Sequence, residues 1–157
     1  MKRIAIVYYS RTGNTEKMAR LVEEGVKSES GVRAEVKKVE DFPAAEALKY
    51  DGLIIGSPTY YGSMSSEIKK FLDETVEHHG KLSGKVGAAF SSAANVGGGN
   101  ETTVLSVLNA FLIHGMIVQG DHRGDHYGPV SIGSPDARVK KQCHALGKKV
   151  AVLVKML

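Results

Sequence analysis

The sequence predicts an α/β protein built on a doubly wound, five-stranded parallel sheet with helices on both faces. Strand and helix patterns alternate along the whole chain. Most of the strand patterns are continuous apolar runs, which is typical of parallel strands covered on both faces. The unusual residues gather in loops that follow the strands, where the ligands of such sheets bind. With 157 residues and no repeat or linker, the chain is expected to form one domain over residues 1–157.

The first half of the chain predicts three strands and one long helix. An apolar run from Arg3 to Tyr9 predicts the first strand, and helical spacing of apolar residues predicts a helix at about Asn14 to Lys27. Val32 to Val39 alternates apolar and charged residues, as a half-exposed edge strand does. After a loop with Pro43 and a short segment rich in Ala and Glu, Asp51 to Ser57 predicts a third, strongly apolar strand.

From Pro58 onward the chain predicts two more strands and three helices. The fourth and fifth strands are expected at Lys85 to Ser91 and at Met116 to Val118, and the last helix from about Pro135 to Lys155. Residues at helical spacing, apolar except for Thr75, mark the other two helices: Ile68, Phe71, Leu72, Thr75 and Val76 in one, Val104, Leu105, Leu108, Phe111 and Leu112 in the other. Gly120 to Ser134 is expected to be a loop, longer than the usual connection of about 4–6 residues.

Composition excludes several classes of protein. Hydrophobic residues make up 42% and charged residues 24%, which is ordinary for a soluble globular protein. No apolar run approaches the roughly 20 residues of a membrane span, and no signal peptide precedes the first strand, so we expect a cytoplasmic location. The net charge of +4 comes without an arginine-rich block or base-stacking aromatic pattern, so we expect no nucleic-acid partner. The single cysteine, Cys143, lies on the apolar stripe of the last helix and is expected to be a buried core residue.

The turn after the first strand is the strongest candidate for a phosphate site. The first amides of a helix lack acceptors and the N-terminal end of its dipole is positive, so such a turn binds anions. Backbone amides and the hydroxyls of Ser10, Thr12 and Thr15 would hold the phosphate, with Arg11, Gly13 and Asn14 in the same turn. An ordinary turn in which Thr12 or Asn14 only caps the helix is the alternative.

Two further loops are suited to a flat ring. One contains Pro58, Thr59, Tyr60, Tyr61 and Gly62, whose adjacent tyrosines can lay an aromatic face against the ring. The other is nearly free of bulky side chains, so its backbone can approach the ring and donate to it. Its residues are Ser91, Ser92, Ala93, Ala94, Asn95, Val96, Gly97 and Gly98. A phosphate site and a ring site together predict a mononucleotide with a large heterocycle.

At this point the chain resembles the flavodoxin-like superfamily, and most of all the NAD(P)H:quinone oxidoreductases related to the tryptophan-repressor-binding protein. The resemblance rests on YYSRTGNTEKMA, GSPTYYGSMSSEIKKFLD, FSSAANVGGGNE and HGM, and it covers nearly the whole chain. It implies a sheet of strand order 2-1-3-4-5 and FMN bound noncovalently. The FMN phosphate would lie at Ser10 to Thr15, and its ring between the Pro58-to-Gly62 and Ser92-to-Gly98 loops.

The resemblance also implies a reaction, in which the flavin takes a hydride from NAD(P)H and reduces a quinone. The alternative is a flavodoxin that carries electrons between protein partners and has no substrate of its own. Three departures from the quinone-reductase branch leave the substrate pocket and the choice between dimer and tetramer open. Ile113 stands where a first histidine is common, the segment from Val76 to Lys81 is short and lacks tryptophan, and the tail after Tyr127-Gly128 is trimmed.

The long loop carries the remaining candidates for chemistry. Its Asp-His pairs, Asp121-His122 and Asp125-His126, match no established metal-ligand spacing, so no metal is expected. His126 and Tyr127 are weak catalytic candidates, because either could cover the flavin or donate a proton to a quinone oxygen.

Overall fold

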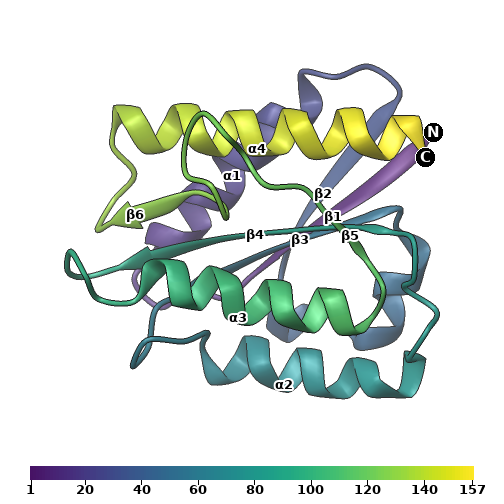
Figure 1. Ribbon diagram of the computed structural model, residues 1–157, viewed down its shortest axis with the longest axis horizontal. Helices are drawn as coiled ribbons and strands as arrows, with labels where there is room; N and C mark the ends of the chain where they lie inside the picture. Colours follow the sequence, from purple (N-terminus) through teal and green to yellow (C-terminus); the bar gives the residue numbers. More distant parts are fainter.

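In the computed structural model, which describes residues 1–157, a parallel sheet lies between two layers of helices (Figure 1). The strand order is β2-β1-β3-β4-β5, as predicted. The strands are β1 (Lys2–Tyr8), β2 (Val32–Lys38), β3 (Gly52–Pro58), β4 (Val86–Ala93), β5 (Ile117–Val118) and β6 (Val130–Ile132). The helices are α1 (Asn14–Lys27), α2 (Ser66–Glu74), α3 (Asn100–Ile113) and α4 (Ala137–Met156). Three 3₁₀ turns, η1 (Val39–Asp41), η2 (Ala44–Lys49) and η3 (Thr75–His78), complete the chain.

The fifth position of the sheet is shared by two short strands, which corrects the expectation of a continuous loop from Gly120 to Ser134. β5 pairs with the start of β4, where Ile117 lies opposite Val86. β6 pairs with the end of β4, where Val130 lies opposite Ser91. Residues 119–129 leave the sheet between them. A three-residue strand is too short to give a periodic signal, so only its pairing with β4 reveals it.

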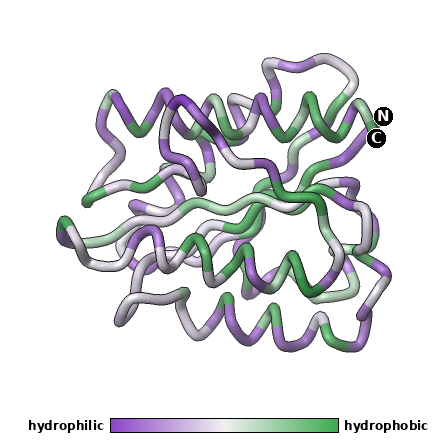
Figure 2. Tube along the Cα trace, viewed as in Figure 1, coloured by the Kyte–Doolittle hydropathy of each residue, from purple (hydrophilic) through white to green (hydrophobic).

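Each face of the sheet buries its own apolar core. Residues of β1 alternate between the two, with Ile4 and Ile6 facing α1 and α4, and Ala5 and Val7 facing α2 and α3. Figure 2 shows this as hydrophobic central strands flanked by helices that alternate between hydrophobic and hydrophilic turns. The helix pairs therefore cover both faces and leave the strand ends accessible, which is where a ligand can approach the sheet.

Two glycines bring α1 and α4 into backbone contact. A Cβ atom on Gly25 would lie 2.1 Å from the carbonyl oxygen of His144, and one on Gly147 would lie 2.1 Å from that of Val22. No side chain fits at either position, so the helix pair packs as closely as its backbones allow. This contact holds the C-terminal half of α1 against α4.

The remaining differences from the predicted elements are small. The helix expected to include Thr75 and Val76 ends as α2 at Glu74, and both residues lie in the 3₁₀ turn η3. Cys143 is fully buried, and burial raises the pKa of its thiol to about 12, which agrees with a core role. None of the helices has both the length and the apolar run needed to cross a bilayer.

Candidate cofactor-binding cleft

A cleft of about 390 Å³ opens at the carboxyl edge of the sheet. The strands end at this edge, which lies at the left of Figure 1. Loops that follow β1, β3, β4 and β6 meet there, although they come from distant parts of the sequence. The residues that line it are Ser10, Arg11, Thr12, Asn14, Thr15, Pro58, Thr59, Tyr60, Ser92, Ala93, Ala94 and Gly133. Eleven of these twelve belong to the three predicted loops, and Gly133 was not predicted.

The turn after β1 presents free backbone donors. Gly13 is the N-cap of α1, with a left-handed φ of 99° and no side-chain cap. Ser10 Oγ accepts from the amides of Gly13 (3.1 Å) and Glu16 (3.3 Å). The amides of Thr12, Asn14 and Thr15 have no acceptor in the chain. The alternative, in which Thr12 or Asn14 only caps the helix, is therefore not observed. The three free amides are available to donate to an anion, as in the backbone nests that bind phosphate in other proteins.

A pair of hydroxyls lies beside these amides. Thr15 Oγ1 and Ser92 Oγ are 2.9 Å apart, and both residues are almost fully buried at the base of the cleft. The pair has two hydroxyl protons but uses only one between its own oxygens. The second proton remains to donate to a ligand, which adds a side-chain donor to the row of backbone donors.

The loop after β3 forms a tight turn at the mouth of the cleft. The amide of Tyr60 donates to Ser63 O (2.9 Å) and the amide of Ser63 donates back to Tyr60 O (3.2 Å). Both central residues have positive φ, 49° for Tyr61 and 78° for Gly62, as a type I′ turn requires. The Tyr61 side chain is fully exposed at the tip of the turn, whereas Tyr60 lines the cleft.

The loop after β4 touches this turn through glycine. A Cβ atom on Gly99, whose φ is 104°, would lie 2.6 Å from the Cα atom of Gly62. Thr102 Oγ1 bonds across the same contact, 2.6 Å from Gly62 O and 2.9 Å from Gly99 O. The two loops expected to hold a ring are therefore fixed relative to each other by backbone contact.

Asn100 joins the bases of the loops by hydrogen bonds. It was not among the predicted site residues. Its Oδ1 accepts from Ser91 Oγ (2.6 Å) and Thr59 Oγ1 (3.3 Å), and its Nδ2 donates to Ser131 O (3.1 Å). One buried side chain thus joins the ends of β3, β4 and β6. An amide residue directly after three glycines was the available signal, since its side chain can both donate and accept.

The other predicted residues lie behind or beside the cleft. Ser91 is fully buried and faces Asn100 rather than the cleft. Gly13 belongs to the turn after β1 but does not line the cleft. The outer tips of the two ring loops are formed by Tyr61, Gly62, Asn95, Val96, Gly97 and Gly98.

His126 and Tyr127 do not line the cleft. Their segment is anchored to α4, because the Asp125 carboxylate accepts from Arg138 Nη1 (2.6 Å) and its amide donates to Gln142 Oε1 (3.1 Å). The ring of His126 bonds Asp121 O through Nδ1 (2.7 Å), and Tyr127 is half exposed. Their role in catalysis stays a prediction, and their absence from the cleft lining does not support it.

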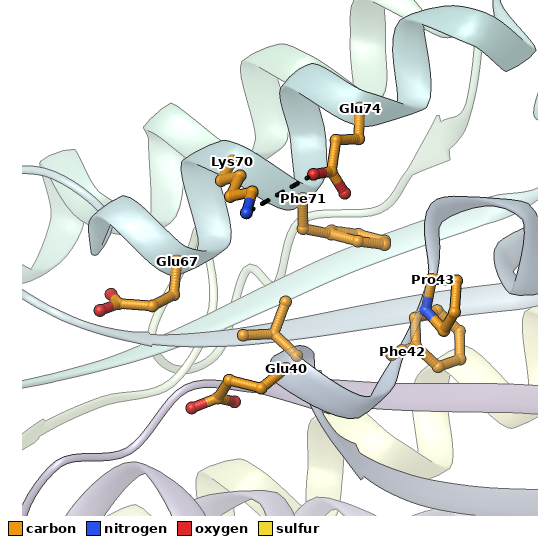
Figure 3. Close-up of a pocket in the computed structure, with 8 residues that line it drawn as sticks. Glu40, Phe42, Pro43, Glu67, Lys70, Phe71 and Glu74 are labelled. Atoms are coloured by element: carbon orange, nitrogen blue, oxygen red, sulfur yellow. Dashed lines mark ion pairs between the residues drawn. The ribbon is translucent and has the colours of Figure 1, made fainter.

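A second hollow of about 330 Å³ lies between η1 and α2 (Figure 3). Phe42 and Phe71 form its apolar wall, and Lys70 points to Glu74, 4.0 Å away. Glu40 and Glu67 also line it, and burial together with the Glu67 carboxylate raises the pKa of nearby Tyr9. Carboxylates disfavour a phosphate, so this hollow differs in chemistry from the cleft.

The fold and the cleft together define a nucleotide-binding α/β protein. Free amides and a spare hydroxyl fit a terminal phosphate, and two loops in fixed contact fit a flat ring. A family model for flavodoxin matches residues 6–104, a range that contains both the phosphate turn and the ring loops. The chain therefore belongs to the flavodoxin family, and this agrees with FMN as the predicted cofactor.

Individual relatives divide between two kinds of flavoprotein. A flavodoxin from Aquifex aeolicus is 38% identical over 159 residues, covering 96% of this chain and 86% of the relative. An NAD(P)H dehydrogenase (quinone) from Archaeoglobus fulgidus is 35% identical over 191 residues and covers all of both chains. A solved flavodoxin from the domain Archaea superposes with a TM-score of 0.81 at 28% identity, covering 98% of this chain and 99% of the other. The chain is thus a flavodoxin-like oxidoreductase.

Proposed function

We propose that residues 1–157 form one FMN-binding domain that transfers electrons from NAD(P)H to a quinone. The observation that carries this proposal is the row of unpaired amides at Thr12, Asn14 and Thr15, beside two loops in fixed contact. The full-length similarity to a relative named NAD(P)H dehydrogenase (quinone) supports the choice of donor and acceptor.

In this proposal the chain contributes binding and orientation. The free amides and the Thr15–Ser92 hydroxyl pair would hold the FMN phosphate, with the Arg11 guanidinium at the rim adding positive charge. The Pro58-to-Gly62 and Ser92-to-Gly98 loops would hold the ring between them. Bound FMN supplies the hydride and electron chemistry, which no side chain of this protein can perform.

The mouth of the cleft favours a neutral, flat acceptor. Its two flanking loops, 57–66 and 91–100, contain no charged side chain. Tyr61 and Val96 project from their tips, 110% and 89% exposed, and offer apolar surface against which a quinone can stack. A uniformly charged rim would instead have favoured a charged protein partner.

A carrier flavodoxin is the second candidate, and one observation favours it. Glu40 and Glu67 lie close to Tyr9, whose ring packs edge-on against Tyr60 of the cleft at 6.5 Å between centroids. Neither carboxylate forms an ion pair, so they could meet cations of a partner protein beside the flavin.

Two measurements separate these candidates. The first is an absorption spectrum of the purified protein, followed by heat release and identification of the chromophore, for which we expect FMN. The second is steady-state oxidation of NADH and NADPH with a benzoquinone by the FMN-loaded protein. Turnover with the quinone supports the enzyme, whereas FMN binding without turnover supports the carrier. A protein that neither carries nor takes up FMN would contradict both.

A further inference from the structure

A notch lined by positive charge opens beside the cofactor cleft, on the face covered by α1 and α4. It measures about 390 Å³ and contains no carboxylate in its lining. Its residues are Lys17, Arg20 and Leu21 of α1, Ser134 and Pro135 of the loop after β6, and Lys140 of α4. We refer to these six residues as the cationic notch.

The cationic notch and the phosphate end of the cleft are neighbours. Gly133 lines the cleft, and the next residue, Ser134, lines the notch. The amide of Lys17 donates to Gly13 O (3.0 Å), so this lysine lies one helical turn beyond the phosphate turn. Its Nζ donates to Ser134 Oγ (3.3 Å) and closes the boundary between the two hollows. The notch therefore adjoins the phosphate end of the cleft.

The charges of the notch have few partners in the chain. Neither Lys17 nor Lys140 has a carboxylate within 4.0 Å, whereas Arg20 forms ion pairs with Glu16 (3.9 Å) and Glu23 (3.6 Å). The two unpaired lysines around one hollow repel each other, and a bound anion removes this repulsion. A phosphate monoester suits the site because it carries close to two negative charges and accepts hydrogen bonds from amines and from the Ser134 hydroxyl.

We propose that the cationic notch binds the phosphate monoester of a second ligand, namely the 2′-phosphate of NADPH. This inference rests on the proposed function, because it concerns the electron donor of that reaction. NADH lacks the group and would leave the notch without an anion. The protein would therefore prefer NADPH to NADH through Lys17 and Lys140.

The direct test measures binding without turnover. The FMN-loaded protein is titrated by calorimetry with adenosine 2′,5′-bisphosphate, with 5′-AMP and with inorganic phosphate at low ionic strength. We expect the bisphosphate to bind best, and its affinity to fall about fivefold in Lys17→Gln and in Lys140→Gln, with a larger loss in the double variant. Lys81→Gln removes an exposed lysine outside the notch and is the matched control.

Each result decides one point. Equal binding of the bisphosphate and 5′-AMP, or equal loss in the Lys81→Gln control, overturns the site. If inorganic phosphate binds as well as the bisphosphate, and its binding is lost in the same variants, the ligand of the notch is free phosphate and the assignment to NADPH is overturned.

Turnover then separates this inference from the proposed function. We expect the ratio of kcat/KM for NADPH to that for NADH to exceed one and to fall about tenfold or more in the double variant. A ratio unchanged by the double variant overturns the NADPH preference while quinone reduction stands. An absence of turnover with both donors, together with specific binding of the bisphosphate, overturns the proposed function and leaves the phosphate site standing.

Discussion

The two edges of the sheet are both rich in polar groups, but the carboxyl edge leaves a row of backbone donors unpaired. At the amino edge the groups are paired: Arg3 Nη2 and Tyr50 OH each donate to the Glu35 carboxylate at 2.9 Å, and the Arg3 amide donates to Asp51 at 2.8 Å. At the carboxyl edge the amides of Thr12 and Asn14 have no acceptor. A paired group contributes to stability, whereas an unpaired donor is available to a ligand. The unpaired donors therefore distinguish the carboxyl edge as the one suited to bind a ligand.

The largest effect is expected at the contact between the two ring loops. Gly99→Ala places a Cβ atom 2.6 Å from Gly62 Cα and forces the loops apart. We expect FMN affinity to fall about 100-fold, which corresponds to about 3 kcal/mol. Gly31→Ala is the control, because Gly31 also has positive φ (82°) but has no atom near its Cβ position. Fluorescence titration with FMN measures both variants, and equal affinities in the two would contradict the role of the contact.

A matched pair of threonine variants tests the comparison directly. Thr15 and Thr75 are both 1% exposed, the first at the carboxyl edge and the second beside His114 at the other end of the helices. Thr15→Val should weaken FMN binding about tenfold through the lost donor, with little change in the stability of the cofactor-free protein.

Thr75→Val should do the opposite. Thr75 Oγ1 donates to Leu72 O (2.6 Å), so it accepts from His114 Nε2 (2.7 Å), and valine leaves that donor without an acceptor. We expect a loss of about 1–3 kcal/mol in urea unfolding and unchanged FMN affinity. If the two variants had the same profile, the two edges would not differ in the way described.

At the amino edge, Glu35 should contribute to stability but not to binding. The Arg3 hydrogen bond, followed by that from Tyr50, lowers the pKa of Glu35 below its ordinary value. Its stabilising contribution is therefore complete above the pKa of the unfolded state and is lost as the pH falls through the folded pKa. Glu35→Gln should cost about 1 kcal/mol at neutral pH, given the partial exposure of the pair, and should flatten the loss of stability below about pH 5. Unfolding curves that stay parallel for the two proteins across this range would argue against it.

The smallest effect is expected from His114. Burial, with a further contribution from His79, lowers the pKa of His114 below its ordinary 6.5. The folded state then binds fewer protons than the unfolded state, so stability falls as the pH drops from the unfolded pKa toward the folded one. His114→Gln should reduce the fall in Tm between about pH 7 and about pH 5. An identical fall in the variant would show that other groups cause it.

The sequence alone determined the strand-turn-helix unit at the start of the chain and the order of elements after it. The apolar run of β1, the hydroxyls of the turn and the stripe of α1 are contiguous, so local periodicity and helix-end chemistry were enough to predict them. The ring loops lie at the predicted edge of the sheet, because the carboxyl ends of parallel strands meet there.

Which residues of those loops meet depends on the packing of the whole chain. Thr15 and Ser92 form one hydroxyl pair across 77 residues, Asn100 joins three strand ends, and the short strand β6 brings Gly133 to the cleft and Ser134 to the cationic notch. Sequence periodicity indicates which face of a single helix or strand is buried. The distance between segments far apart in the sequence is set by how the helices pack against the sheet and against each other, as where Gly25 and Gly147 bring α1 and α4 into backbone contact, and no local pattern records it.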